Sequence, residues 1–389
     1  MTLPERRFPD SRRCNVDDRP MPNDPVSNRR GLSNVHDRPL APERYRSHDD
    51  GRRRFAYGRA GRRQVSVRWR AMLASVLIGV LSVGTSLQPA IAAARPVGGQ
   101  APGYYRMHVG RFEVTALLDG THPFPSDKVA VNAKPGEVDA LLAAQYLPPA
   151  FEGMINAFLV NTGDRLVLID TGAGNLYGKE GGGLVSAIRA AGYTPDQIDD
   201  IFITHLHEDH AGGLLLDGKP VFAKAIVHVS KRDADFWLND ANQANVDDLL
   251  KPFFPAIQQV VAPYIAAGRF KPFEGEAPLL PGLTPIAAPG HTPGHTFYLL
   301  QDEGQSLLFW GDTVHMQPVQ FADPNIAIRY DWNADMAVAA RKAILARASA
   351  EHWWVAGAHI SFPGIGHVVA DNGHYRWVPA NYTLNRITP

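Results

Sequence analysis

The stretch Thr204–Gly213, THLHEDHAGG, crowds metal-binding side chains into one short turn directly after the apolar run IDDIFI. These side chains are His205, His207, Glu208, Asp209 and His210. Imidazole nitrogens and carboxylate oxygens are the ligands that a zinc-like ion accepts when cysteine is absent. The alternative, a solvated polar loop, does not require the H-x-H-x-D-H spacing. The pattern therefore predicts a metal site.

The loop can serve two ions. His205 and His207 lie two positions apart, so at an extended strand end both side chains can point to the same side. Asp209 and His210 are adjacent and can serve a second ion, whereas we expect Glu208 between the two pairs to face solvent. Each ion takes four or five ligands, so further ligands have to come from other parts of the chain.

Three later residues, each close behind an apolar strand-like run, complete the two sets. TPIAAP precedes His291, LLFW precedes Asp312 and WWVAGA precedes His359. We expect His291 to complete the first set and His359 the second, while the two oxygens of Asp312 bridge both ions. Two ions about 3.5–4 Å apart hold a hydroxide that is a strong nucleophile at neutral pH. Asp209 and Asp312 are thus the predicted catalytic carboxylates. Zn²⁺ is the expected metal, although Mn²⁺, Fe²⁺, Co²⁺ or Cd²⁺ suit the same ligands.

Composition narrows the class of protein. The chain has 389 residues, 45% of them hydrophobic, so it can bury a sizeable core. The zero net charge hides a split, because residues 1–70 carry 18 Arg and 9 acidic residues, which leaves 21 basic and 30 acidic residues in the remainder. An acidic domain repels polyphosphate, so nucleic acid is not an expected partner. The single cysteine, Cys14, lies in the basic stretch and leaves the remainder without thiolate ligands.

The N-terminus resembles a targeting segment. Residues 1–70 form an Arg-rich tail that is too poor in aliphatic side chains to fold alone. The basic stretch RRQVSVRWR, the apolar run Ala71–Leu87 and the small residues up to Ala94 are typical of a signal peptide, spanning about residues 62–94. We expect residues 71–94 to hold the apolar region and cleavage site, and export to the periplasm or the medium to follow. The alternatives are a membrane anchor, for which the run is slightly short, and a translation start placed too early.

Residues 95–389 read as one α/β (α+β) domain. Strand-like and helix-like runs alternate in two blocks, and several strands end in His or Asp. This rhythm predicts two sheets between helices, with the ligands at one edge. We expect a helix over 334–350 with Asn333 as its N-cap, a helical region over 246–268 that its prolines break into pieces, and a last strand within 351–359.

The motifs LVLIDTG, THLHEDH, PGHTPGH, GDT and GAH, in this order, resemble the metallo-β-lactamase superfamily over most of residues 105–360. The resemblance implies a four-layer αββα sandwich. It also implies that Asp170 shapes the ligand loop and that His295 supports the site without binding metal. The alternatives are an ordinary turn aspartate at 170 and a direct ligand at 295.

Two features favour a hydrolase of lactones, aryl esters or organophosphorus compounds within this superfamily. His207 stands where the redox di-iron branch has Glu, and Asp312 is present where true β-lactamases generally lack a bridging aspartate. The domain has neither the inserted domains nor the basic surface of the RNA-processing branch. β-Lactam hydrolysis and a non-catalytic binding protein remain as weaker alternatives, and complete ligand sets disfavour the latter.

The segments APGYYRM, FEVTALLDG, ADFWL, FKPF and YRWVPANY resemble the methyl parathion hydrolase group over roughly residues 101–385. That group has an aromatic cage beside its metals, and the matching positions are Phe124, Tyr177, Trp237 and Phe254. From the sequence alone, aromatic residues on helices are more often core. Val129 and His315 depart from the group, where an arginine and an aliphatic residue stand. We therefore expect an exported dinuclear hydrolase, and a possible homodimer, whose substrate is a small, neutral, hydrophobic ester or lactone. Phosphotriester hydrolysis is the alternative.

His315 lies three residues after the bridging aspartate. It is a candidate for orienting a substrate carbonyl or for passing a proton to the leaving group. The alternative is a packed polar residue.

The signal segment yields the first prediction. N-terminal sequencing of protein exported by its native host should show a chain that starts between Ala93 and Ala101, because an apolar run followed by small residues directs cleavage there. A mature chain that retains residues before Ala71 would contradict export with cleavage.

Overall fold

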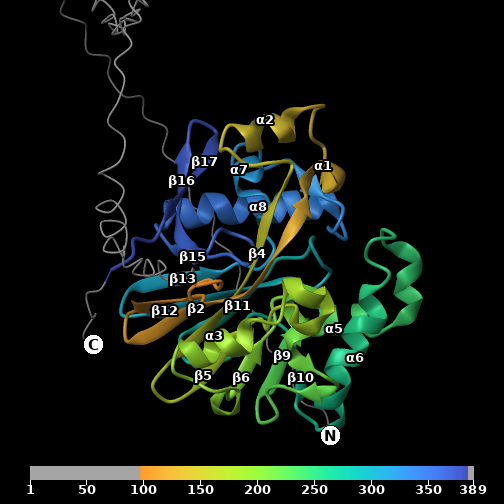
Figure 1. The fold of residues 1–389 in the computed structure, drawn as a ribbon, viewed down its shortest axis with the longest axis vertical. Helices are drawn as coiled ribbons and strands as arrows, with labels where there is room; N and C mark the ends of the chain where they lie inside the picture. The colour runs from red at the N-terminus through yellow and green to blue at the C-terminus, as the bar shows by residue number, and fades with distance from the viewer. Residues whose placement is uncertain (1–96, 384–389) are drawn as a thin grey trace, which may run out of the picture. The chain divides into compact units, whose positions relative to one another are not determined.

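The structure, a computed structural model, describes residues 97–383 (Figure 1). The expected Arg-rich tail and signal segment lie outside the described residues and stay predictions. Within residues 97–383, no helix is long and apolar enough to cross a membrane.

The first main sheet is antiparallel on one side and parallel on the other. Its strands, in spatial order, are β1 (Tyr104–Val109), β2 (Phe112–Pro125), β4 (Ala150–Asn161), β5 (Leu166–Ile169), β6 (Asp200–Phe202), β9 (Ile226–Ser230) and β10 (Phe270–Phe273). Strands β5, β6, β9 and β10 pair in parallel. The carboxyl ends of parallel strands share one edge, where ligands of open α/β sheets gather. The loop after β6 leaves the sheet at this edge.

The second main sheet holds the remaining long strands. They are β11 (Leu283–Ala287), β12 (Thr296–Asp302), β13 (Gln305–Phe309), β15 (Trp354–Ala356), β16 (Ile365–Asp371) and β17 (His374–Pro379). Only β13 and β15 pair in parallel within this described sheet. The prediction that 351–359 holds the last strand is wrong, because β16 and β17 follow. Asn372 and Gly373 join them with φ of 48° and 90°, as a tight hairpin turn requires.

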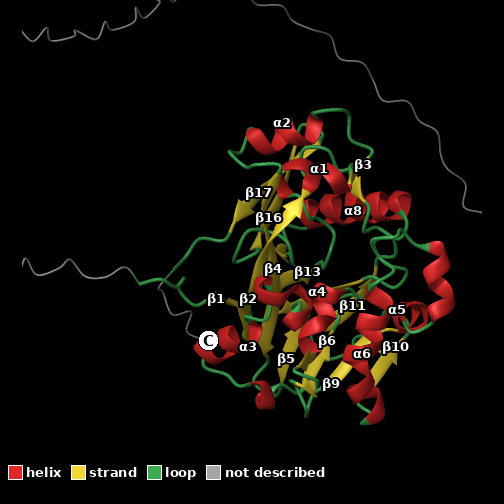
Figure 2. Cartoon of the chain, turned by 45° about the vertical axis from the view of Figure 1, so that its right-hand side comes forward, coloured by secondary structure: helices red, strands yellow, loops and turns green. Residues whose placement is uncertain are grey.

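Alternate side chains along each strand enter different hydrophobic clusters, and this separates four layers. On β13, Leu307 and Phe309 pack between the sheets, whereas Leu308 packs in the cluster that includes helix α8 (Ala334–Ala350). On β5, Ile169 packs between the sheets, whereas Leu168 packs against the helices on the far side. Those helices are α3 (Leu184–Ala190), α5 (Lys231–Trp237) and α6 (Phe253–Ala266). The predicted αββα sandwich is confirmed (Figure 2).

A further cluster forms a cap over one end of the sandwich. It joins Phe124 and Phe151 of the first sheet to Val129, Leu142 and Val319. The elements involved are α1 (Ser126–Val129), α2 (Glu137–Ala143), α7 (Gln317–Gln320) and the two-stranded pair β3 (Ala130–Val131) and β14 (Ala327–Ile328). Val129 is therefore a buried cap residue.

The short elements lie in the connecting loops. They are α4 (Glu208–Ala211), the pair β7 (Leu215–Leu216) and β8 (Lys219–Pro220), and the 3₁₀ helices Gly174–Glu180, Pro195–Gln197, Gly212–Leu214 and Asp240–Asn245.

One of the two predictions about helices is confirmed, namely the N-cap of α8, and the other, that prolines break the helical region before residue 268, is wrong for α6. Asn333 caps α8 as predicted, since its Oδ1 accepts the N–H of Met336 at 3.0 Å. The prolines do not break α6, which is continuous from Phe253 to Ala266. Pro252 stands at the N-cap and Pro255 in the first turn, where no backbone N–H is needed. Only Pro263 removes an internal hydrogen bond, and the helix tolerates that single loss.

Candidate metal centre

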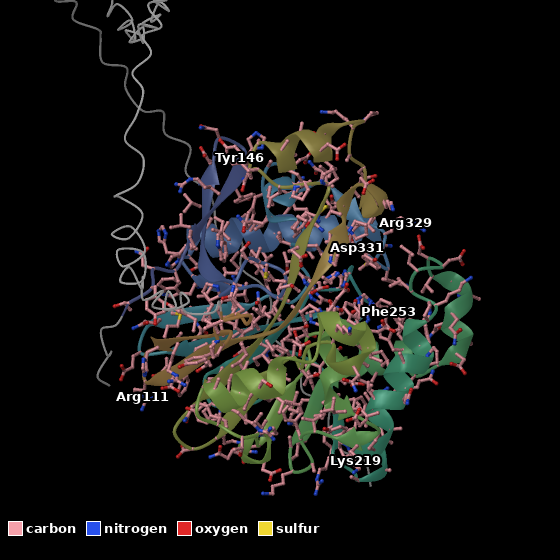
Figure 3. All side chains as sticks on the ribbon, viewed as in Figure 1. Arg111, Tyr146, Lys219, Phe253, Arg329 and Asp331 are labelled. Atoms are coloured by element: carbon pink, nitrogen blue, oxygen red, sulfur yellow. The ribbon has the colours of Figure 1, made fainter. Side chains whose placement is uncertain are left out.

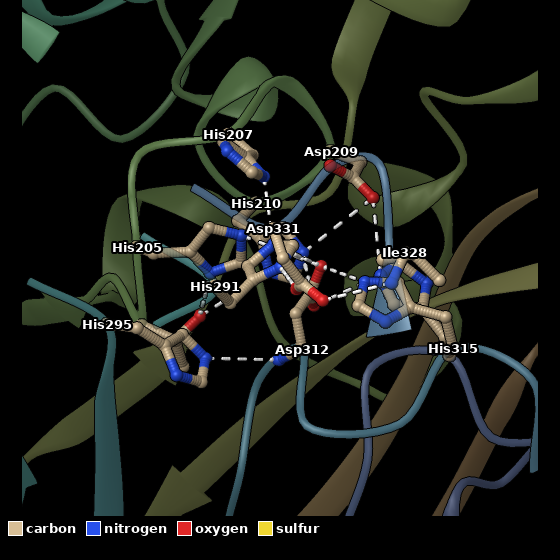
Figure 4. A network of polar contacts seen from close by, with 12 residues as sticks. His205, His207, Asp209, His210, His291, His295, Asp312, His315, Ile328 and Asp331 are labelled. Carbon is tan, nitrogen blue, oxygen red and sulfur yellow. Dashed lines mark hydrogen bonds and ion pairs between the residues drawn. The ribbon is translucent and has the colours of Figure 1, made fainter. Parts of the chain in front are cut away.

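The predicted ligands converge at the carboxyl ends of their strands (Figure 4). Each follows an apolar strand, namely β6, β11, β13 or β15, and none is more than 8% exposed. They form two groups that share Asp312: His205, His207, His291 and Asp312 in the first, and Asp209, His210, His359 and Asp312 in the second. In each group, the candidate ligand atoms all lie within 4.8 Å of one another.

The two oxygens of Asp312 face different groups. Oδ2 lies 3.1 Å from His291 Nε2 and 3.6 Å from His205 Nε2. Oδ1 lies 2.9 Å from His210 Nε2 and 3.0 Å from His359 Nε2. Asp209 Oδ2 adds two contacts to the second group, 3.4 Å from His359 Nε2 and 3.7 Å from His210 Nε2. This geometry is the one that a bridging carboxylate between two ions needs.

Most of the nitrogens that face Asp312 have no hydrogen-bond partner, and this indicates that a metal fits here. Among the described residues, the unpartnered buried atoms include Nε2 of His205, His210 and His359 and Oδ1 of Asp312. His207 presents its Nδ1 to the cluster, 3.0 Å from His291 Nε2. Buried polar atoms normally have a partner. Several unpaired nitrogens around one carboxylate suit divalent cations, whereas a purely hydrogen-bonded cluster would have aligned them. The donor set fits two ions of the zinc type.

In three of these histidines, the ring nitrogen that faces away from Asp312, Nδ1, contacts an oxygen atom of another part of the chain. His210 Nδ1 lies 2.9 Å from Asp170 Oδ2, and His291 Nδ1 lies 2.8 Å from Asp331 Oδ1. His359 Nδ1 donates to the carbonyl oxygen of Met154 at 2.7 Å. Such contacts fix the ring orientation and leave the other nitrogen's lone pair pointing at the ion.

Asp170 shapes the start of the ligand loop, as the resemblance implied. Its backbone takes a left-handed φ of 59° directly after β5. Its carboxylate accepts the N–H of Thr204 at 2.8 Å and the Thr204 hydroxyl at 2.9 Å, in addition to the contact with His210. The first residue of the loop is thereby tied to one of its ligands.

His295 lies behind Asp312 and outside both ligand groups. Its Nε2 accepts the backbone N–H of Asp312 at 3.1 Å. Burial lowers the pKa of His295 to about 3, so the ring is neutral and able to accept. His295 therefore fixes the backbone of the bridging aspartate.

Charge within the cluster is balanced by the carboxylates. Burial lowers the pKa of His205 and His207, which keeps both rings neutral. Burial also lowers the pKa of His210, but attraction by Asp312, Asp209 and Asp170 outweighs it and the pKa is raised. Glu208 is half-buried where we expected solvent exposure. Burial, and next the charge of Asp209, raise its pKa to about 7.

A small cavity of about 40 Å³ opens over the ligand groups. Phe124, Tyr177 and His315 line it as predicted. Trp237 and Phe254 do not, and this corrects the expected cage. Trp237 is fully buried in the helix cluster and touches the site only through an edge contact with the His207 ring, at 5.0 Å between centroids. Phe254 packs behind Trp237, with ring centroids 4.7 Å apart.

The residue that enters the cavity from α6 is Phe253, one position before Phe254. Adjacent helical residues point about 100° apart, so a one-residue shift changes which ring reaches the cavity. Sequence reasoning also missed His122 and Tyr330, which line the cavity, and Asp331, which holds His291. No spacing rule signals these residues. A larger cavity of about 800 Å³ between α2, α7 and β17 contains none of the ligands.

Asp233 on α5 is a further missed residue. Its two carboxylate oxygens accept the N–H groups of Leu206 and Gly294, at 2.6 Å and 2.9 Å. It thereby ties the loop that carries His205 and His207 to the loop that carries His291.

Comparison with known proteins agrees with this geometry. Residues 150–361 match the sequence profile of the family described as "Metallo-beta-lactamase superfamily". A solved structure described as hydrolase AbOPH in the beta lactamase superfamily is 37% identical, with a TM-score of 0.70, and the match covers 73% of this chain and 100% of that one. The solved structure of AidC, described as a dizinc quorum-quenching lactonase with a bound product, is 26% identical, with a TM-score of 0.68 over 72% of this chain and 98% of that one.

Curated proteins point the same way over a shorter region. The N-acyl homoserine lactonase of Bacillus thuringiensis is 25% identical over 153 residues, which are 37% of this chain and 53% of the relative. The chain thus spans about half the length of this curated relative. The finer resemblance to the methyl parathion hydrolase group stays a prediction.

The shared carboxylate leads to a prediction on metal content. Purified enzyme should hold two zinc ions per chain by elemental analysis. Asp312→Ala should bind one ion loosely and lower kcat by about 10³-fold or more, because both ions lose a common ligand. Circular dichroism controls for folding. One ion per chain at full activity would refute the dinuclear centre.

The contact between His291 and Asp331 predicts an effect on one ion only. Asp331→Asn should weaken zinc binding in the first group by about 10- to 100-fold and leave the second group unchanged, as measured by chelator competition. Asp335→Asn is the matched control, since Asp335 is exposed and lies four residues further along. Equal losses at both ions, or no loss, would contradict this assignment.

Proposed function

We propose that this chain, which belongs to the metallo-beta-lactamase superfamily, is a dizinc hydrolase of neutral, hydrophobic lactones and of related aryl esters. Membership and the ligand groups make it a metal-dependent hydrolase. The lactone assignment is supported by the lactonase relatives and by the nature of the cavity. Acyl homoserine lactones, the substrate class in the names of those relatives, are the first candidates.

The single observation that carries the proposal is an aromatic cavity, without lysine or arginine in its described lining, above two complete ligand groups. Phe124, Tyr177, Phe253 and Tyr330 supply aromatic surface, and the lining contains no Lys or Arg among the described residues. Such a wall buries apolar groups favourably. It offers an anionic substrate, such as a carboxylated β-lactam, no cationic partner. Val129 lies buried in the cap and does not line the cavity. The lack of a cationic side chain is therefore a property of the residues that do line it.

Bound ions would supply Lewis acidity and a hydroxide at neutral pH. The residues of the chain position the ligand groups and shield them from water. Asp312 sets the spacing of the two ligand groups, and Asp209 and His359 complete the group on the side of His122. Phe253 covers the ring of His207 edge-on, at 5.1 Å between centroids, and keeps water from that ligand.

His315 is the polar residue beside the bridging carboxylate. Its Nε2 donates to Asp312 Oδ2 at 2.8 Å, and its ring stacks on His359 at 4.9 Å and on Phe124 at 6.2 Å between centroids. Burial lowers its pKa to about 4, so the ring is neutral at pH 7. Its Nδ1 has no hydrogen-bond partner among the described residues. The ring therefore narrows the space next to Asp312.

We also propose that the enzyme is exported, on the strength of the signal-like segment before residue 95. Acyl lactones that cross membranes would then meet the enzyme outside the cytoplasm. The N-terminal sequencing described above tests this proposal separately from the activity.

The crowding by His315 predicts substrate preference. Lactones and aryl esters should exceed methyl phosphotriesters in kcat/KM by at least about tenfold, a difference of roughly 1.4 kcal/mol in the transition state. A trigonal carbonyl carbon fits the narrow space, whereas a tetrahedral phosphorus needs more room. His315→Ala, which removes the ring, should shift the ratio toward the phosphotriester. A panel of the three substrate classes measures this. A wild type that prefers the phosphotriester would overturn the proposal, and an unmoved ratio in His315→Ala would overturn the crowding argument.

A further inference from the structure

The cavity over the ligands is too small to enclose a whole lactone with its acyl chain. Its volume is about 40 Å³. Pockets that take up small organic ligands measure about 300–1,000 Å³. The acyl chain of such a substrate therefore extends out of the cavity, past the walls of its mouth. The position of these walls decides which acyl chains are admitted.

Two aromatic walls come from different parts of the chain. Phe253 stands at the start of α6, and Tyr330 stands in the segment between β14 and α8. Tyr330 packs against the cluster that contains Phe253 and also against the cap cluster that contains Phe124. Figure 3 labels Phe253 and Arg329, the neighbour of Tyr330, on different elements of the same side of the view.

One ion pair spans these two walls. The Arg329 guanidinium donates to both oxygens of Asp247, with Nε to Oδ2 at 3.0 Å and Nη2 to Oδ1 at 2.8 Å. The side chains are 42% and 30% exposed. Exposed ion pairs are weak and salt weakens them further, so this bidentate pair can open during turnover.

Each partner is tied to its own wall. The N–H of Leu250 donates to Asp247 O and the N–H of Phe253 donates to Leu250 O, which links Asp247 to the start of α6 by two turns. On the other side, the N–H of Arg329 donates to Val129 O at 2.8 Å, beside the β3–β14 pair. The pair therefore connects two anchored walls.

We propose that the ion pair between Arg329 and Asp247 is a latch that sets the width of the cavity mouth and hence the length of acyl chain that the enzyme accepts. This inference rests on the proposed hydrolase function. It is independent of the metal ligands, since neither partner contacts one of the seven ligand side chains among the described contacts. With the latch closed, short acyl groups are favoured. With the latch broken, the walls separate and longer groups gain.

The test compares butanoyl and dodecanoyl homoserine lactones. In Asp247→Asn and in Arg329→Gln, the ratio of kcat/KM for the long over the short substrate should rise at least about threefold, as loss of a surface ion pair allows. The charge-reversed double variant, Asp247→Arg with Arg329→Asp, should return toward the wild-type ratio. High salt should shift the wild type in the direction of the single variants and leave Asp247→Asn unmoved.

Asp248→Asn is the matched control. Asp248 neighbours Asp247 and pairs with Lys251 at 2.6 Å on the same loop, without spanning the mouth. The ratio in this variant should stay at the wild-type value. An equal change in Asp248→Asn and Asp247→Asn, an unchanged ratio in both single variants, or no recovery in the reversed pair would each overturn the latch.

A second readout separates the latch from the substrate assignment. Release of zinc to EDTA should be faster in the two single variants than in the wild type and Asp248→Asn, because an open mouth exposes the ions. A wild type inactive on every lactone would refute the proposed function. The same variants would then be compared on p-nitrophenyl acetate and octanoate, where unmoved ratios and unmoved zinc release would refute the latch itself.

Discussion

The whole site depends on one buried carboxylate placed among imidazoles. Asp312 faces nitrogens of both ligand groups at 2.9–3.6 Å, yet none of the atoms involved on the second group is aligned to hydrogen-bond with it. Each unpaired buried polar atom costs about 1–3 kcal/mol, so a fold that gathers several of them is stable only if something else pairs with them. Divalent cations do so for both groups at once. Binding of divalent metal thereby contributes to the folding free energy of this region, and the surrounding elements have to present the ligands at one edge.

The sandwich meets this demand through strand ends and rigid supports. Strands β6, β13 and β15 end at the same edge, and in each case a ligand follows three residues after the end of the strand. Behind the ligands, Asp170 and Asp331 are carboxylates from two different loops, while Met154 offers only a carbonyl. Arg341, buried on α8, donates to the carbonyls of Thr313, Pro324 and Ile326. Its contacts hold the chain on both sides of α7, so helix α8 stabilises the segment that follows the bridging aspartate.

The sequence predicted the ligands better than the cavity, for a physical reason. Metal ligation requires particular side chains directly after strands, and that requirement leaves a readable spacing. A cavity wall requires only apolar surface, which many residues supply. Phe254 and Trp237 were expected at the cavity because helical aromatics there matched a family, but α6 begins at Phe253 and its first ring takes the position. The strands β16 and β17 were overlooked although the Asn372 and Gly373 pair is a hairpin signal. Tyr330 lies in an irregular segment, where no periodicity exists to indicate which way a side chain points.

That irregular segment explains why the ligand motifs indicate the type of reaction but do not identify the substrate. Between β14 and α8, the backbone N–H groups of Trp332 and Asn333 donate to the carbonyls of His291 and Gly290, and Asp331 holds the His291 ring. The preceding residue, Tyr330, faces the cavity instead. One short stretch thus fixes a ligand on one side and forms a substrate wall on the other. The wall can change at Tyr330 while the backbone contacts to His291 persist, because backbone groups do not depend on the side chain beside them. Substrate range can therefore vary in this fold without loss of the metal centre.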